Sequence, residues 1–324
     1  GMIRYTFGQD SMRELELRLG SGEPFVAVMK PGEGFLSFYP AEGDVRLSPW
    51  PGCTFPMQVC RRSTPRDYYM ESIGELAGRL AVDRCKTVIC RTICGQWKVF
   101  SPGAVAAMAH DYFNRLGGSL RFFFHMPEAG YWMGATPELL AERMDGRLHT
   151  IALAGSMAAD SAASWSQKNI DEHNYVVEDI SERIAAGGFA LETGERRELC
   201  YSNAVKHLCT DIYAVAMDGE RELSVADFAA GLHPTPAVAG WPRGKAMREI
   251  AEHELCPRNF YGGVICNNRE GYAYVMLRCM HFDETGWCVY SGGGITGASL
   301  PEEEWEETQS KAKTLLSVLE DYSL

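Results

Sequence analysis

The chain has no apolar run long enough to cross a bilayer, and its N-terminus lacks a basic segment followed by an apolar one. We therefore expect a cytoplasmic protein without a membrane span. Basic residues are in the minority, with 31 Lys and Arg against 43 Asp and Glu and a net charge of -12. Such a chain has little general affinity for nucleic acid or anionic membranes. An anionic substrate would need a local positive site or a bound cation.

Low-complexity stretches, internal repeats and obvious linkers are also missing. Apolar residues make up 46% of the chain and charged residues 23%, which is ordinary for a folded globular protein. At 324 residues, the chain can form one large domain or two smaller ones.

The 11 cysteines lack the paired short spacings of a zinc ribbon. Cys85, Cys90 and Cys94 fall in a strand-like run, and the settings of Cys85, Cys90, Cys266 and Cys279 are apolar. This usage favours reduced thiols in the core over a disulfide scaffold or a zinc site.

The pattern of apolar and turn residues predicts a mixed chain. Residues 1–65 are rich in Gly and Pro and predict β-structure with turns. Apolar spacing and end signals predict helices around 73–80, from Ser101-Pro102 to Gly117-Gly118, over 168–186, over 242–255 and from Pro301. Ser299 stands at capping-box spacing before Glu302. Strands are predicted at 87–90, 121–125, 131–140, 148–153, 262–267, 271–279 and 286–291. Consecutive hairpin-like strands indicate an α+β chain with antiparallel sheets.

Some polar and glycine-rich positions could carry chemistry, but none decides a function alone. Glu304, Glu307 and Lys311 project from similar sides of the last predicted helix, and Glu307 with Lys311 is an ordinary surface ion pair when taken alone. Glu172 alone is a solvated carboxylate near a helix N-terminus. Gly292–Gly294, between a predicted strand and a predicted helix, could expose N–H groups to an anion or form a plain turn.

Taken in order, ten segments resemble the chorismate-utilising enzymes, which include anthranilate, aminodeoxychorismate, salicylate and isochorismate synthases. The segments are Lys86–Arg91, Gly134–Leu140, Ala152–Ser156, Glu172-His173, Val205–Leu208, His233–Ala237, Tyr261–Gly263, Leu277-Arg278, Gly292–Ile295 and Glu304–Thr308 with Lys311. The resemblance covers about residues 65–322. It implies an α+β (α/β) fold of two stacked antiparallel β-sheets flanked by helices. A single domain would span 1–324, with 1–65 as a reduced N-terminal β segment and 66–324 as the catalytic core.

Two alanines indicate which member the chain resembles. Ala154 stands where aminodeoxychorismate synthases carry a nucleophilic lysine, and Ala237 stands where anthranilate and salicylate synthases carry Thr. The resemblance therefore points to isochorismate synthases, isomerases in which water adds at C2 of chorismate and the C4 hydroxyl leaves. A salicylate synthase and a non-catalytic chorismate-binding relative are the alternatives. No tryptophan-binding motif is found, and we expect no obligatory glutamine amidotransferase subunit. Menaquinone, catechol siderophores and salicylate all begin with isochorismate.

The resemblance also implies roles for individual residues. Lys86 would be the general base that activates water, and Glu138 the general acid, with a raised pKa. His207 would orient the acid, or else be a structural histidine. Mg²⁺ would be held by Glu172 and Glu307, with Glu304 in a supporting place. The residues expected to contact chorismate are Gly155, Ala237, Tyr261, Arg278, Gly292, Gly293, Gly294 and Lys311.

Overall fold

The computed structural model describes residues 3–6, 9–41, 43–83, 85–116, 118–158, 160–200, 205–216 and 224–323. The chain divides into two compact units. Unit 1 contains residues 1–138, 238–265 and 275–324, and unit 2 contains residues 139–237 and 266–274. The expectation of one domain therefore stays a prediction. None of the helices in these described ranges is long and apolar enough to cross a membrane.

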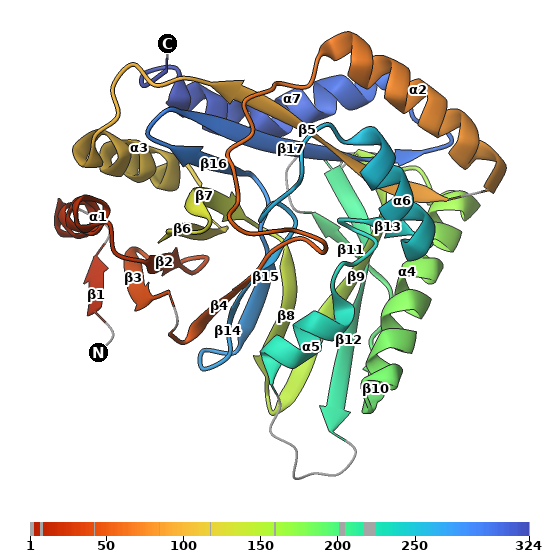
Figure 1. The fold of residues 1–324 in the computed structure, drawn as a ribbon. Helices are drawn as coiled ribbons and strands as arrows, with labels where there is room; N and C mark the ends of the chain where they lie inside the picture. Colours follow the sequence, from red (N-terminus) through yellow and green to blue (C-terminus); the bar gives the residue numbers. More distant parts are fainter. Residues whose placement is uncertain are drawn as a thin grey trace. The chain divides into compact units, whose positions relative to one another are not determined.

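Unit 1 is built on an antiparallel sheet of nine strands in the order β1-β3-β2-β6-β7-β16-β17-β5-β13 (Figure 1). The strands are β1 (Ile3–Thr6), β2 (Phe25–Met29), β3 (Phe35–Pro40), β5 (Lys86–Gly95), β6 (Leu120–Met126), β7 (Gly130–Thr136), β13 (Gly240–Trp241), β16 (Cys279–Asp283) and β17 (Gly286–Thr296). The two long strands β5 and β17 pair over ten residues each, from Lys86 opposite Thr296 to Gly95 opposite Trp287. This long ladder is the part of the fold on which the candidate site is built.

The helices described in unit 1 are α1 (Gln9–Ser21), α2 (Arg66–Asp83), α3 (Pro102–Asn114), α6 (Arg243–His253) and α7 (Pro301–Leu319). Apolar side chains of α1, α3 and α7 form one core with the sheet residues Phe123, Phe282 and Val289. Burial of these large side chains is the main source of stability for the unit. Helix α1 corrects the prediction for residues 1–65, because its mostly polar sequence carries only a weak apolar stripe, in which Leu15 and Leu19 are buried.

Unit 2 contains a second antiparallel sheet, with neighbouring strands β10-β12-β9-β8-β15 and β11 paired with β12. Its elements are β8 (Leu139–Met144), β9 (Arg147–Ala158), α4 (Gln167–Ala186), β10 (Phe189–Thr193), β11 (Arg197–Cys200), β12 (Val205–Ala216), α5 (Val225–Leu232) and β15 (Tyr272–Val275). Two further strands are β4 (Val45–Ser48) in unit 1 and β14 (Val264–Asn267), where the chain passes from unit 1 to unit 2.

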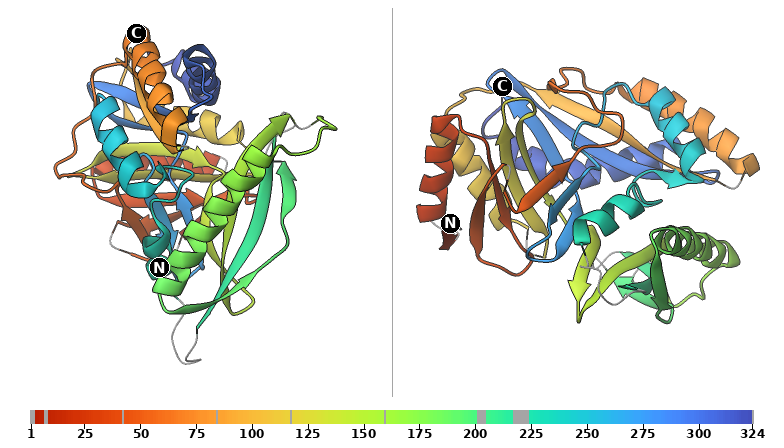
Figure 2. Two further views of the ribbon diagram at one scale, coloured as in Figure 1. Left: turned by 90° about the vertical axis from the view of Figure 1, so that its right-hand side faces the viewer. Right: turned by 60° about the horizontal axis from the view of Figure 1, so that its bottom comes forward.

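Helix α4 lies against β9 and β12 (Figure 2). Its buried residues Val176, Ile180 and Ile184 recur every fourth position and form its apolar face. Ser166 caps its N-terminus by accepting a hydrogen bond from the Asn169 N–H at 3.2 Å, and the helix ends at Gly187. Together the two large antiparallel sheets and the helices on them confirm the predicted α+β class.

Four local predictions are wrong. The strand predicted over 131–140 is two strands, β7 and β8, which are separated by Pro137-Glu138. Gly292–Gly294 lie inside β17 instead of in a turn before a helix. Ser299 does not cap α7: the cap position is Leu300, and the Ser299 hydroxyl accepts a hydrogen bond from the Thr296 N–H at 3.0 Å. The predicted strand over 271–279 is two strands, because Arg278 takes a left-handed φ of 47° between β15 and β16.

Helix α3 begins as predicted but ends early. The Ser101 hydroxyl accepts a hydrogen bond from the Ala104 N–H at 3.2 Å. The last helical residue is Asn114, before the predicted Gly117-Gly118 stop, and Gly117 lies outside the described residues.

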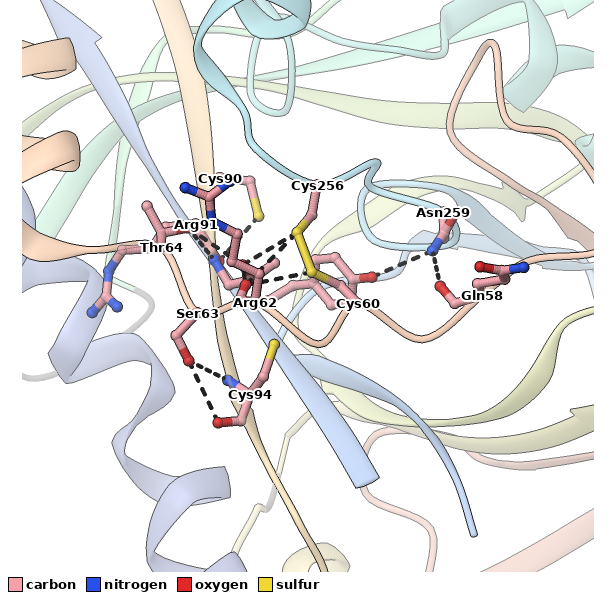
Figure 3. The surroundings of a disulfide bond; sticks show 12 residues. Gln58, Cys60, Arg62, Ser63, Thr64, Cys90, Arg91, Cys94, Cys256 and Asn259 are labelled. Carbon is pink, nitrogen blue, oxygen red and sulfur yellow. Dashed lines mark hydrogen bonds between the residues drawn. A yellow bond between two sulfur atoms is a disulfide. The ribbon is translucent and has the colours of Figure 1, made fainter. Parts of the chain in front are cut away.

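The cysteine prediction is partly confirmed. Cys85, Cys90, Cys266 and Cys279 are buried and carry thiols. However, a disulfide joins Cys60 to Cys256, whose Cα atoms lie 6.4 Å apart although 196 positions separate them in sequence (Figure 3). The expectation of reduced thiols throughout is therefore wrong, because the fold brings together cysteines whose spacing carries no signal.

Candidate active site

Gly292–Gly294 lie where three groups of side chains approach one strand. A Cβ added at the first glycine would lie 2.5 Å from the Tyr261 hydroxyl oxygen. At the second it would lie 3.3 Å from Glu304 Oε2, and at the third 2.9 Å from Lys86 Cε. Only glycine leaves room for all three neighbours. Because successive residues of a strand face opposite sides of the sheet, Tyr261 and Lys86 approach one face of β17, and the glutamates of α7 approach the other face at Gly293.

The position of α7 on this strand is fixed by a buried arginine. Arg91 of β5 is 2% exposed, and its Nε donates to the Thr308 hydroxyl at 2.7 Å. Its guanidinium lies over the Trp305 ring, 3.8 Å from the centroid, and burial lowers its pKa. The Ser291 hydroxyl adds a hydrogen bond to the Thr308 carbonyl at 2.8 Å. These contacts hold one turn of α7 in register with β5 and β17.

Two glutamates on that turn of α7, Glu304 and Glu307, form a candidate cation site. Glu304 Oε2 is buried and has no hydrogen-bond partner among the described residues. Burial raises the pKa of Glu304, a hydrogen bond with Ser299 opposes this, and the charge of Glu307 raises it further. A Cβ on Gly293 would be 3.7 Å from Glu307 Oε1, so both carboxylates face the same glycine. Two carboxylates with an orphaned oxygen fit a hard cation such as Mg²⁺.

Lys311 supplies positive charge beside Glu307. Its Nζ donates to Glu307 Oε1 at 2.6 Å and to the Gly292 carbonyl at 3.0 Å. The predicted surface ion pair is thus real, but it also ties α7 to the glycine strand. Because Lys311 remains exposed, its ammonium group can contact a ligand while it holds Glu307.

Glu138 lies two residues after β7, at the last position of the first stretch of unit 1. Its N–H donates to the Thr136 hydroxyl at 3.2 Å, and its carbonyl accepts from the Val275 N–H at 3.0 Å. Burial raises the pKa of the Glu138 carboxyl, while the charges of Lys86, Arg278 and Lys311 oppose the shift. A carboxyl whose pKa is raised by burial holds its proton to higher pH, which suits it to proton donation.

Arg278 is held in an unusual backbone conformation beside the same region. Its φ of 47° is rare for a residue with a side chain. The Arg278 carbonyl accepts hydrogen bonds from the Tyr112 hydroxyl at 2.8 Å and the Ala135 N–H at 3.3 Å. Strain of this kind persists only where the surroundings enforce it, and here it presents an exposed arginine.

A buried ion pair that sequence reasoning missed supports β5 near Lys86. Arg258, 2% exposed, donates to Glu254 Oε1 and to the Val88 carbonyl, both at 2.7 Å. Glu254 Oε1 also accepts from the Cys90 N–H at 2.7 Å. In sequence, this Glu and Arg four residues apart resemble a solvated helix-end pair. Only the hydrogen bonds to β5 distinguish this pair from a solvated one.

The remaining predicted residues belong to unit 2. Gly155 sits at an irregularity in the pairing of β9 with β12, with φ at 74°. Its carbonyl lies 3.1 Å from His207 Nδ1, which fits a hydrogen bond donated by the ring. A Cβ at Gly155 would lie 3.3 Å from Asn169 at the start of α4. Gly155 thus joins His207 to the helix that carries Glu172. Ala237 is partly buried near the end of the same unit.

His173, the neighbour of Glu172, has a structural explanation. It is 1% exposed, and its Nε2 lies 2.8 Å from the Thr210 hydroxyl on β12. Burial lowers its pKa to about 4, so it is neutral at ordinary pH. The buried histidine fixes the rotation of α4, and therefore which side of the helix Glu172 occupies.

Residues 59–320 match the family of chorismate binding enzymes, and the chain belongs to this family. It is 32% identical over 210 residues to isochorismate synthase EntC of Escherichia coli strain K12, which covers 60% of this chain and 53% of that relative. It is 31% identical over 200 residues to isochorismate synthase DhbC of Bacillus subtilis strain 168, covering 58% and 50%. The matches thus span about half the length of these relatives.

The fold is similar to that of a solved structure, the menaquinone-specific isochorismate synthase MenF from Escherichia coli. The TM-score is 0.67 at 22% identity, covering 98% of this chain and 84% of that one. This likeness concerns the fold, and it confirms the fold family that the ordered segments predicted.

Proposed function

We propose that this chain is a magnesium-dependent isochorismate synthase, an isomerase that converts chorismate to isochorismate. The observation that carries the proposal is the glycine run of β17, which Tyr261 and Lys86 approach at Gly292 and Gly294 and the glutamates of α7 approach at Gly293. Family membership and the names of the relatives support the substrate and the reaction. Water adds at C2 of the ring, the double bonds shift, and the C4 hydroxyl leaves as water, so the atoms balance without a co-reactant.

Two side chains move the protons. Lys86 Nζ accepts a proton from the water that attacks C2, which requires that the amine be unprotonated at that moment. The Glu138 carboxyl gives its proton to the departing C4 oxygen. Burial keeps the Glu138 pKa above its ordinary value, which favours the protonated acid. His207, whose Nδ1 is committed to the Gly155 carbonyl, orients groups on the acid side.

The dicarboxylate substrate is bound by cations and backbone. Arg278 and the N–H groups of Gly292–Gly294 take the pyruvyl carboxylate, and Tyr261 lines the pocket. Lys311 and Gly155 assist at the ring carboxylate. Ala237 stands where the relatives that eliminate pyruvate carry a threonine hydroxyl. Without that hydroxyl the reaction stops at isochorismate, which then feeds menaquinone or siderophore synthesis. The water nucleophile needs no amidotransferase partner.

The metal is assigned to the glutamates. Glu307 and Glu304 would hold Mg²⁺ in unit 1, and the resemblance adds Glu172 from unit 2. The resemblance implies only a supporting role for Glu304. Its buried Oε2 atom, which has no partner among the described residues, supports direct contact with the ion instead. When bound, the ion supplies positive charge for the substrate carboxylate in a protein of net charge -12.

The test is an assay of the purified protein with chorismate and Mg²⁺, with products separated by chromatography. We expect isochorismate without pyruvate, and loss of activity with a chelator. Salicylate with pyruvate would instead identify a salicylate synthase. No turnover in the presence or absence of metal, from protein that is folded by circular dichroism, would overturn the enzyme assignment.

A further inference from the structure

Four cysteines from distant parts of the sequence meet in unit 1. Cys94 of β5 and Cys288 of β17 are directly opposite each other in the ladder. The Sγ atoms of Cys60, Cys94 and Cys288 all lie within 4.8 Å of one another, and Cys256 is bonded to Cys60. Figure 3 shows the bonded pair with the sulfur of Cys94 turned toward it. Cys288 is fully buried, while the other three are partly buried.

The cysteines are held in place by hydrogen bonds as well as by the disulfide. The stretch before α2 runs along β5: the Thr64 N–H donates to the Thr92 carbonyl at 2.9 Å, and the Cys94 N–H donates to the Ser63 hydroxyl at 2.9 Å. The Thr92 hydroxyl lies 3.7 Å from the Cys256 sulfur. Because these contacts do not pass through the disulfide, the four sulfur atoms stay together when that bond is reduced.

We propose that the reduced form of this cluster, Cys60, Cys94, Cys256 and Cys288, is a binding site for one Zn²⁺ ion. Zinc bound by four thiolates is tetrahedral with Zn–S distances of about 2.3 Å, which places the sulfur atoms roughly 3.8 Å apart. The sulfur atoms of Cys60, Cys94 and Cys288 lie within 4.8 Å of one another, which is close to that requirement, and Cys256, released from Cys60 by reduction, would supply the fourth thiolate. The thiolates that hold an iron–sulfur cluster lie further apart than the four thiolates around a single zinc ion.

The chemistry balances with a named reductant. A phosphine gives two electrons to the bond between Cys60 and Cys256, and water supplies the oxygen of the phosphine oxide and the protons of the two thiols. Zinc then binds the four thiolates and releases the thiol protons.

The site is separate from the proposed active site in position and in ligand type. Cys94 lies eight residues along β5 from Lys86, or about 26 Å at roughly 3.3 Å per residue. Its ligands would all be sulfur, which suits Zn²⁺, whereas Mg²⁺ requires oxygen. With four protein ligands, the ion would have no open position for a substrate. It would bind the segment just after α6 and the stretch before α2 to the paired strands β5 and β17.

The experiment measures metal content and thiol protection in the full-length protein. The protein is reduced with a phosphine, dialysed against Zn²⁺ and then against buffer, and zinc per chain is determined by mass spectrometry. We expect one zinc per chain, a raised melting temperature, and zinc-dependent protection from alkylation of Cys60, Cys94 and Cys256, the partly buried members of the cluster. Co²⁺ in place of zinc should give the absorption of a tetrahedral thiolate site.

Variants make the test specific. Cys94→Ser and, independently, Cys288→Ala should each reduce bound zinc from one per chain to near none. Cys53→Ser, which removes a partly buried thiol hydrogen-bonded to Asn259, should retain it. Because Cys94 is only partly buried, its variant should fold even if the Cys288 variant does not. Zinc that survives the Cys94 substitution, failure of the reduced protein to bind zinc, or a Cys60–Cys256 bond that resists reduction in the folded protein would each overturn the proposal.

Discussion

Lys86 and Gly294 occupy adjoining space on neighbouring strands: a methyl group on Gly294 would lie 2.9 Å from Lys86 Cε. The clash would fall on the far end of a flexible side chain, so the lysine can move away without a shift of the backbone. The cost to the fold is therefore small, while the proposed base is displaced.

Gly294→Ala should accordingly lower kcat by about 100-fold, the usual worth of a positioned base, and leave the melting temperature nearly unchanged. The control is Gly78→Ala on α2, where an added Cβ meets nothing within 4 Å. Steady-state kinetics and thermal unfolding test the pair. Full activity in Gly294→Ala would argue against Lys86 as the base.

Glu304→Gln tests the orphaned carboxylate oxygen. Without metal, this change removes a buried charge beside Glu307 and should stabilise the protein by about 1 kcal/mol. With metal, the gain in melting temperature that Mg²⁺ gives the wild type should be lost. Glu303→Gln, an exposed neighbour on α7, should do neither. If Glu304→Gln leaves the Mg²⁺-dependent stabilisation intact, the residue does not contact the ion.

Glu138→Gln should lower kcat/KM by roughly 10²–10⁴-fold, because the amide cannot donate the proton. The acid works only when protonated, and burial raises its pKa. Wild-type activity should therefore fall as pH rises through that raised pKa. This alkaline limb of the pH–activity profile should be absent from the residual activity of the variant. Glu128→Gln in the exposed β6–β7 turn should keep the wild-type profile. An unchanged limb in Glu138→Gln would assign it to another group.

His173 predicts a loss of stability in acid. Its folded pKa is about 4, below the ordinary value of 6.5, so the unfolded chain binds the proton first. The contribution of His173 to the free energy of unfolding is complete above pH 6.5 and declines as pH falls from 6.5 to 4. Below pH 4 the free energy of unfolding is lower by roughly 3 kcal/mol at most. Urea unfolding of His173→Gln should show a correspondingly shallower decline, whereas His110→Gln should match the wild type. If the free energy of unfolding falls with pH equally in the wild type and in His173→Gln, His173 is not the cause of the loss of stability in acid.

Much of the fold could be predicted because periodicity and end signals act locally. Ser101 marks the start of α3 by a hydrogen bond within one turn, and the recurrence of Val176, Ile180 and Ile184 at every fourth position reveals the buried face of α4. Helix α1 was missed because its apolar stripe is weak. The Gly292–Gly294 run was assigned to a turn because glycine is typical of turns. Inside β17, the same absence of a side chain serves the close approach of other residues.

The relations between site residues could not be predicted from spacing. Glu304 and Glu307 look equivalent in sequence, and only the contacts of Arg91 on β5 set the turn of α7 that buries one Glu304 oxygen. Arg258 and Glu254 resemble a surface pair until the strand they support is known. The roles of Lys86 and Glu138 came from the resemblance alone, and they stay predictions that the kinetic variants address.

Unit 2 is assembled from two stretches of chain, and this has a consequence for the protein during its synthesis. Strand β8 pairs on one side with β9, which follows at once, but on the other side with β15, where Tyr272 lies opposite Glu142. A ribosome that adds 5–20 residues per second needs roughly ten seconds to reach that partner. Throughout this interval the nascent sheet keeps an open edge, a ready template for pairing with another chain. Nascent chains that stall before β15 should therefore depend most on chaperones.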